Sequence, residues 1–168
     1  MIEPKEFLDF LKSRRSIRCF SNEMLKKEEI EMILEAARST PSASNRQAWK
    51  FIVITDRDTI NKLSKQAIYG KFIREAPVLI AIVGDIHENP NWYVQDTSLA
   101  SMQMMLMAWS LNIGTCWIGS MDRERAKEII GIIPDNFLLT ILPFGHLRKK
   151  VPNPTPRKNL EEITDWIE

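Results

Sequence analysis

Apolar and polar residues repeat along the chain with two different periods, which together predict five helices and four strands. The helical period is clearest from Leu25 to Thr40, where Ile30, Ile33 and Leu34 share one face and glutamates occupy the other. Helices are predicted over residues 4–12, 25–40, 56–65, 92–112 and 123–130. Strands are predicted over residues 49–55, 77–85, 114–120 and 137–146. This alternation favours a mixed sheet that is covered by helices on both faces.

Two of the predicted elements are apolar in almost every direction. The strand over residues 77–85 is apolar on both faces, which indicates a central place in the sheet. The helix over residues 92–112 is apolar nearly all round, which predicts burial on all sides, either in the core or against a second subunit. Residues 97–121 carry no charge, but interspersed serines and the break at Gly114 favour a buried helix over a membrane span.

Length and charge narrow the class of protein. The 168 residues are expected to form one domain over residues 1–168, with a core that needs neither disulfides nor metal. The net charge of +1 gives no overall field that would attract nucleic acid or a membrane. Cys19 and Cys116 fit neither a zinc spacing nor a disulfide framework, and the N-terminus does not read as a secretory signal. A cytoplasmic, reducing environment is therefore expected.

The motifs of the common nucleotide-binding and hydrolytic enzymes are absent from the sequence. There is no G-x-G-x-x-G fingerprint, no P-loop, no G-x-S-x-G elbow and no H-E-x-x-H. His87 and His146 are expected to be surface or capping residues, and Cys116 a small buried hydrophobe. Since no side chain stands out as an acid, base or nucleophile, a bound group would have to supply any redox chemistry.

A basic stretch near the start, S-R-R-S-I-R-C-F, indicates what that group could be. It sets Arg14, Arg15 and Arg18 around Ser16, and these arginines repel one another unless an anion lies between them. Taken alone, the stretch is more typical of a solvated basic turn. Arginine, however, pairs bidentately with phosphate, and Ser16 adds a hydroxyl donor.

Three further segments would complete such a site. A basic stretch in the proline-rich, extended C-terminal tail could close on the phosphate through Arg157 and Lys158. The loop P-S-A-S-N offers short amide and hydroxyl groups to a polar ring, and the strand end W-I-G-S offers backbone N–H groups beside a glycine that permits close approach. A flat redox ring edged by amides, with a phosphate held by arginines, describes a flavin mononucleotide (FMN) site.

The chain resembles the FMN-dependent nitroreductases over nearly its whole length. The resemblance rests on five segments in the family's order: R-R-S-I-R-C-F, P-S-A-S-N-R-Q-A-W-K-F-I-V-I, E-A-P-V-L-I-A-I-V-G-D, V-Q-D-T-S-L-A-S-M-Q-M-M-L-M-A-W-S-L-N-I-G-T-C-W-I-G-S and L-P-F-G-H-L-R-K-K-V-P-N-P-T-P-R-K-N-L-E-E-I. It implies an α+β fold with a central, mixed but mostly antiparallel sheet between helical layers. It also implies an intertwined homodimer with FMN at the interface.

The resemblance also implies roles for particular residues. It assigns four groups to the cofactor: Arg14, Arg15, Ser16 and Arg18 to the phosphate and ribityl chain; Arg157, with Lys158 as a weaker candidate, to the phosphate; Pro41, Ser42, Ala43 and Asn45 to the flavin of the other subunit; and Ile118 and Gly119 to the reactive edge of the ring. Relatives often carry an amide side chain for the pyrimidine end of the flavin. Here the matching region offers Gln66, Tyr69 or Gly70.

The activity implied is ping-pong hydride transfer, with NADH or NADPH as donor and a small oxidant such as a nitroaromatic or a quinone as acceptor. The flavin carries the chemistry, and no side chain is assigned as catalytic. Three alternatives remain open at this point: another flavin-dependent reduction such as dehalogenation, an FMN-binding dimer without turnover, and a nucleotide- or RNA-binding module. The neutral net charge disfavours the last of these.

Overall fold

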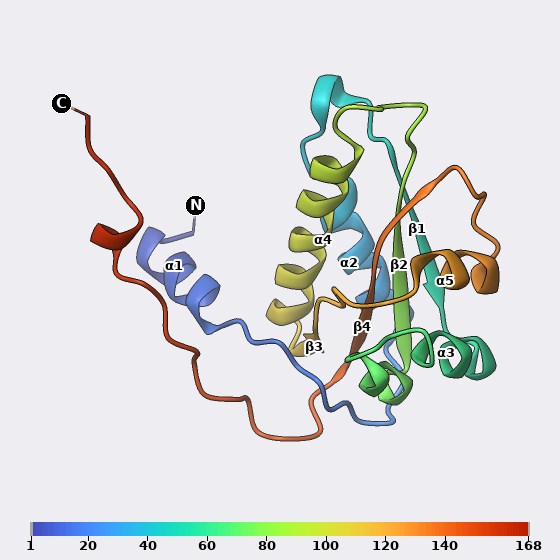
Figure 1. Cartoon of the computed structure of the whole chain (residues 1–168). Coiled ribbons are helices and arrows are strands. Elements are labelled where there is room, and N and C mark those ends of the chain that lie inside the picture. The colour runs from blue at the N-terminus through green and yellow to red at the C-terminus, as the bar shows by residue number, and fades with distance from the viewer. Residues whose placement is uncertain (1, 168) are drawn as a thin grey trace.

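The computed structural model of the chain describes residues 2–167 and shows a four-stranded sheet between two layers of helices (Figure 1). The helices are α1 (Pro4–Ser13), α2 (Lys27–Arg38), α3 (Arg57–Ser64), α4 (Tyr93–Ser110) and α5 (Arg123–Ile130). The strands are β1 (Trp49–Ile54), β2 (Val78–Gly84), β3 (Ile113–Thr115) and β4 (Phe137–His146). Three short 3-10 turns are η1 (Ala43–Asn45), η2 (Lys71–Glu75) and η3 (Leu160–Glu162).

The sheet has the strand order β1-β2-β4-β3, and every pairing between these strands is antiparallel. The expected parallel component is reduced to one bridge, between Ser16 and Thr115, the sole parallel pairing in residues 2–167. The prediction of helices on both faces is confirmed, and the sheet is mixed only through this bridge.

The central strand β2 is buried along its whole length, as its continuous apolar sequence predicted. Because successive side chains in a strand point to opposite faces, β2 contributes to two separate cores. Leu79, Ala81 and Val83 pack in the cluster that includes residues of α3 and α5. The alternate residues of β2 pack in the cluster that includes residues of α2 and α4.

The predicted third strand, over residues 114–120, is mostly wrong. Strand β3 ends at Thr115, which pairs with Phe144 of β4. The next residue of β4 in this register is Pro143, which has no N–H to continue the ladder. Residues 116–120 therefore leave the strand, and the carbonyl of Ile118 accepts a hydrogen bond from the Thr140 hydroxyl at 2.9 Å.

Helix α4 departs from the prediction of burial on all sides. One face is buried and includes Ala100, Met104 and Ala108. On the other face, Leu99 is 51% exposed and Met102 is 41% exposed, so an apolar surface remains uncovered in the single chain. Within residues 2–167, no helix has the length and hydrophobicity that crossing a bilayer requires.

Helix α1 and the C-terminal tail extend together away from the body of the molecule (Figure 1). The end of α1 is fixed to α4, because the indole Nε1 of Trp109 donates a hydrogen bond to the Ser13 hydroxyl at 2.7 Å. Residues 149–167 are exposed throughout. The expected last helical turn is found as η3, near the end of this tail.

Candidate functional site

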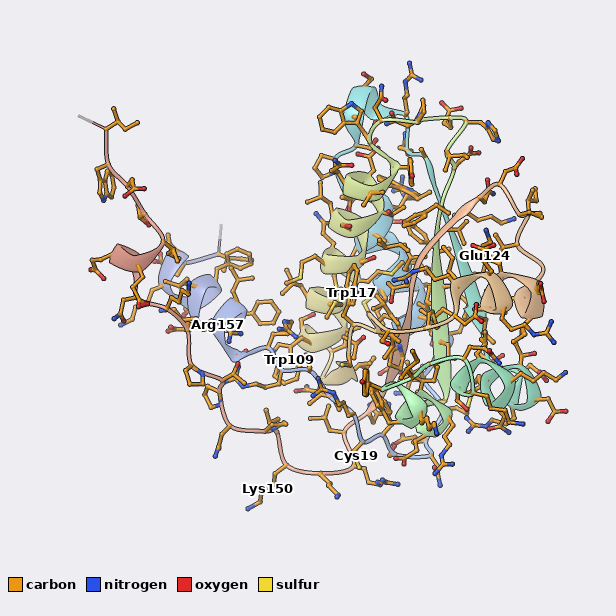
Figure 2. The ribbon with its side chains drawn as sticks, viewed as in Figure 1. Cys19, Trp109, Trp117, Glu124, Lys150 and Arg157 are labelled. Atoms are coloured by element: carbon orange, nitrogen blue, oxygen red, sulfur yellow. The ribbon has the colours of Figure 1, made fainter. Side chains whose placement is uncertain are left out.

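A basic cavity lies between the end of α1 and the C-terminal tail. It has a volume of about 620 Å³, and Arg14, Arg15 and Arg157 all line it, together with Lys12 and one carboxylate, that of Asp9. Figure 2 shows Arg157 on the tail where the tail runs beside α1. The two basic stretches from opposite ends of the chain, proposed from sequence to close on one anion, therefore share one cavity.

The two neighbouring arginines of this cavity have different surroundings. One Nη1 group of Arg15 donates to the carbonyls of Lys12, Ser13 and Arg14 at 2.7–2.9 Å. These carbonyls lie at the C-terminal end of α1, where backbone acceptors lack partners within the helix and a cation is favoured. Arg15 thus caps α1, and of its guanidinium only Nε is buried without a partner among the described residues.

Arg14 is the arginine that is left free for a ligand. Its Nη1 is buried and has no hydrogen-bond partner within residues 2–167. Burial, followed by the nearby charge of Arg157 and then that of Arg15, lowers the pKa of the Arg14 guanidinium. A buried donor without a partner and a set of mutually repelling cations are both stabilised by a bound anion.

A second, smaller cavity of about 120 Å³ holds three more of the predicted site residues. Arg18, Ile118 and Gly119 line it, together with Tyr69 and Gly70. Arg18 is therefore separated from the cavity of Arg14 and Arg157.

Cys116 lines the second cavity and lies near the arginine segment. Its thiol is 3% exposed, as the prediction of a small buried residue required, and burial raises its pKa. The charge of Arg18, the hydroxyl of Ser16 and the charge of Arg14 oppose that shift, so all three lie near the thiol. The segment from Arg14 to Arg18 consequently runs from the first cavity to the second, with Ser16 between them.

Of the three residues considered for the pyrimidine end of a flavin, Tyr69 and Gly70 line the second cavity. Gln66 is not among the lining residues, and its side-chain amide donates to the Lys62 carbonyl at 3.4 Å. Burial of Gly70 against Ala67 and Ile118 leaves no room for a larger residue there, since an added Cβ would lie 2.9 Å from the Cβ of Ala67.

Gly114 and Gly119, on either side of Cys116 in the sequence, yield a stability prediction. An added Cβ at Gly114 would lie 2.7 Å from the Cβ of Ile17, which is buried next to the arginine segment. An added Cβ at Gly119 would meet no atom within 4 Å. We expect Gly114→Ala to lower the free energy of unfolding by about 1–3 kcal/mol, the usual cost of overpacking a core. Chemical denaturation of Gly114→Ala and of its matched control, Gly119→Ala, measures this, and equal stabilities would contradict the prediction.

The predicted loop residues Pro41, Ser42, Ala43 and Asn45 do not join either cavity. They lie beside the first turn of α4, at the opposite end of that helix from Trp109 (Figure 1). Residues Ser44, Asn45 and Gln47 have φ angles of 53°, 54° and 55°, a region that side chains other than glycine adopt rarely. In one chain, the loop and the arginine segment are therefore two separate halves.

The loop is held by a residue that the sequence analysis did not select. The Asp96 carboxylate is 3% exposed and accepts hydrogen bonds from the Ala43 N–H at 3.1 Å and from the Asn89 amide at 3.0 Å. Asp96 is the sole charged residue of α4, which is the sequence signal that could have identified it.

Lys158, the weaker candidate in the tail, is exposed and is not among the residues that line the first cavity.

The chain matches the model of the nitroreductase family over residues 11–69 and 62–146. It belongs to the nitroreductase family. The tail that carries Arg157 lies outside the matched ranges. What supports Arg157 as a site residue is therefore the cavity it shares with Arg14, and not the family model.

Individual nitroreductase relatives agree with this assignment. A protein of Archaeoglobus fulgidus, provisionally named NADH dehydrogenase/NAD(P)H nitroreductase, is 34% identical over 149 residues, which cover 84% of this chain and 86% of that protein. A protein of Methanothermobacter thermautotrophicus with the same provisional name is 32% identical over 86% of this chain and 79% of its own length. The solved structure of an FMN-dependent nitroreductase from Clostridium difficile R20291 has a TM-score of 0.85 and 26% identity, over 95% of this chain and 98% of that one. The predicted nitroreductase fold is thereby confirmed.

Proposed function

We propose that this nitroreductase is an FMN-dependent oxidoreductase that uses NADH or NADPH to reduce small oxidants such as nitroaromatics or quinones. One observation carries the proposal: Arg14, whose buried Nη1 has no partner among residues 2–167, lines a cavity that Arg157 also lines. The names of the relatives support it, since they describe NAD(P)H nitroreductases and, in one solved structure, FMN dependence.

The residues present fit this cofactor. Arg14 and Arg157 would hold its phosphate, and Arg15 would keep α1 in place while offering its buried Nε. Ser16, between the cavities, would face the ribityl chain, and the backbone of Ile118 and Gly119 would lie at the edge of the ring beside Arg18. FMN, when bound, supplies the hydride acceptor and donor that the chain's own side chains lack. The open space at Gly119 leaves room for a substrate to approach.

We further propose that two copies of the chain form the complete site. Within one chain, the loop of Ser42, Ala43 and Asn45 lies apart from the arginine cavities. Asp96 holds that loop in a defined conformation, as a preformed binding loop requires. In a homodimer, the loop of one subunit would contact the flavin whose phosphate is held by the other.

The visible absorption spectrum of the purified protein, before and after FMN is added and excess removed, tests the function. We expect the two-band spectrum of a bound flavin, which bleaches anaerobically with NADH or NADPH and returns when a quinone or a nitroaromatic is added. A protein that retains no FMN would overturn the proposal. A bound flavin that neither nucleotide reduces would instead identify a flavin-binding protein without turnover.

A further inference from the structure

A third cavity, of about 470 Å³, lies between α3 and η2 and is rich in positive charge. Its lining residues are Asn61, Ser64, Lys65, Lys71 and Arg74, with no carboxylate among those described. The cavity is not part of the arginine cavity of α1 or of the cavity at Gly119.

The cations of this cavity lack the carboxylate partners that some surface cations have elsewhere in the molecule. Lys27 pairs with Glu31, and Arg125 pairs with Glu128. In the described part of the chain, no ion pair and no side-chain hydrogen bond involves Lys65, Lys71 or Arg74. Residues 59–74 contain four cations and no acid. The region is therefore locally basic although the whole chain is nearly neutral.

The acids that flank this run do not neutralise the cavity. The Glu75 carboxylate is taken up by Arg148, whose Nη2 lies 2.8 Å away. Asp58 is in the first turn of α3, about 10 Å along the helix axis from Lys65. The walls are also held in place, because the Arg57 guanidinium of α3 donates to the carbonyls of Arg74 and Ala76 at the end of η2. The cavity is thus a defined feature that lacks a counter-charge.

The cavity lies next to the proposed flavin site. Tyr69 and Gly70 form a wall of the cavity at Gly119, and Lys71, one residue and about 3.8 Å of backbone further, lines the basic cavity. The residues just before Tyr69 are fixed, because Ala67 pairs with Met121 and the Ile68 N–H donates to the Ser120 carbonyl at 3.1 Å. The Tyr69 side chain is 86% exposed at this boundary and presents an aromatic surface on which a nucleotide could stack.

We propose that the basic cavity binds the 2′-phosphate of NADPH while the nicotinamide lies at the Gly119 cavity, so that the enzyme prefers NADPH to NADH. This inference rests on the proposed function, whose FMN phosphate already occupies Arg14 and Arg157. A phosphate monoester carries close to two negative charges near neutral pH, and Arg74 can pair with it bidentately while Lys65 and Lys71 add point charges. NADH lacks that group and gains nothing from the cavity.

Steady-state kinetics of the FMN-loaded protein at low ionic strength test the preference. We expect kcat/KM for NADPH to exceed that for NADH by about tenfold or more, as several charge-assisted contacts to one phosphate would give. Lys71→Gln/Arg74→Gln should lose most of that ratio through NADPH alone, and Lys65→Gln, on a different element, should change it in the same direction. The control Lys27→Gln/Lys50→Gln removes the same charge from exposed positions elsewhere and should keep the ratio.

Calorimetric titration with adenosine 2′,5′-bisphosphate and with adenosine 5′-monophosphate gives a second readout that involves no hydride transfer. We expect the bisphosphate to bind more tightly than the monophosphate, and the cavity variants to lose that difference. An unchanged NADPH/NADH ratio in the variants, or an equal loss for both nucleotides, would overturn the assignment to the 2′-phosphate. If the protein binds no FMN, the proposed function fails, and the titration still decides whether this cavity binds the phosphate.

Discussion

Replacing Arg14 with methionine is expected to weaken FMN binding by about 30-fold or more. Removing one partner of a desolvated, hydrogen-bonded charge pair costs about 2 kcal/mol or more, and each 1.4 kcal/mol changes affinity about tenfold. Arg14 is the arginine of the segment whose buried Nη1 has no partner among the described residues. Titration of the apoprotein with FMN, followed by the quenching of flavin fluorescence, measures the change.

The same substitution should raise the thermal stability of the apoprotein, although it weakens FMN binding. Burial, then repulsion from Arg157 and Arg15, lowers the pKa of Arg14. Methionine keeps an aliphatic stem and removes the buried charge, that repulsion and the donor without a partner among the described residues. We therefore expect Arg14→Met to unfold at a higher temperature than the wild type when FMN is absent. An arginine with a purely structural role would give the reverse, and the prediction would then be wrong.

Arg38→Met is the matched control for this experiment. Arg38 is exposed on α2 and pairs with Glu35 of the same helix, far from the cavity in sequence and not among its lining residues. Its replacement should leave FMN affinity within about twofold, because exposed ion pairs contribute little. Equal losses of affinity in both variants would mean that total charge, and not the cavity, governs binding.

The sequence was a sufficient guide where local pattern decides the outcome. The run of apolar residues in β2 predicted a central strand. Of the arginines predicted to hold one anion, Arg14, Arg15 and Arg157 line one cavity, whereas Arg18 lines another. The strand predicted over residues 114–120 failed for a non-local reason, because β3 ends at Thr115, where its register meets Pro143, a residue far along the chain. Nothing in the local sequence from Gly114 to Ser120 contains that information.

The arginine segment shows a second limit of sequence reasoning. Arg14 and Arg15 are indistinguishable by type, yet Arg15 caps α1, whereas the buried Nη1 of Arg14 has no partner among the described residues. Which of them is free depends on the residue at which α1 ends and on the position of its last carbonyls. The exposure of one face of α4 likewise depends on how many elements cover that helix, which periodicity does not report.

The exposed face of α4 is one of several apolar surfaces that the single chain leaves uncovered. Helix α1 exposes Phe7, Leu8 and Leu11, and the tail exposes Ile163 and Trp166. A cavity of about 350 Å³ between α1 and the α2–α4 face is lined by Phe7, Phe10, Ala36, Ser39, Gln103, Leu106, Met107 and Ser110. Exposed apolar surface in several places is the usual sign of a partner. The separation of the loop from the arginine cavities supports our proposal that this partner is a second copy of the chain.

Leu99→Glu/Met102→Glu is accordingly expected to convert a dimer into a monomer. The two residues are three positions apart and lie on the same exposed face of α4. In a twofold-symmetric interface each substitution appears twice, so four carboxylates would lose water without partners, at a cost of several kcal/mol. Size-exclusion chromatography with light scattering should give twice the chain mass of 19.5 kDa for the wild type and a single chain mass for the variant.

The control for this prediction is Ile133→Glu, at an exposed position after α5 where Ile133 is 65% exposed. It adds a carboxylate to a surface that the proposed dimer does not require, so its mass should stay that of the wild type. The monomeric double variant should also bind FMN more weakly, because the loop of Ala43 and Asn45 would no longer reach the flavin of a partner. A wild type of single-chain mass, or a double variant that remains dimeric, would refute the shared site. A monomer with undiminished FMN affinity would show instead that one chain's arginine cavities hold the flavin unaided.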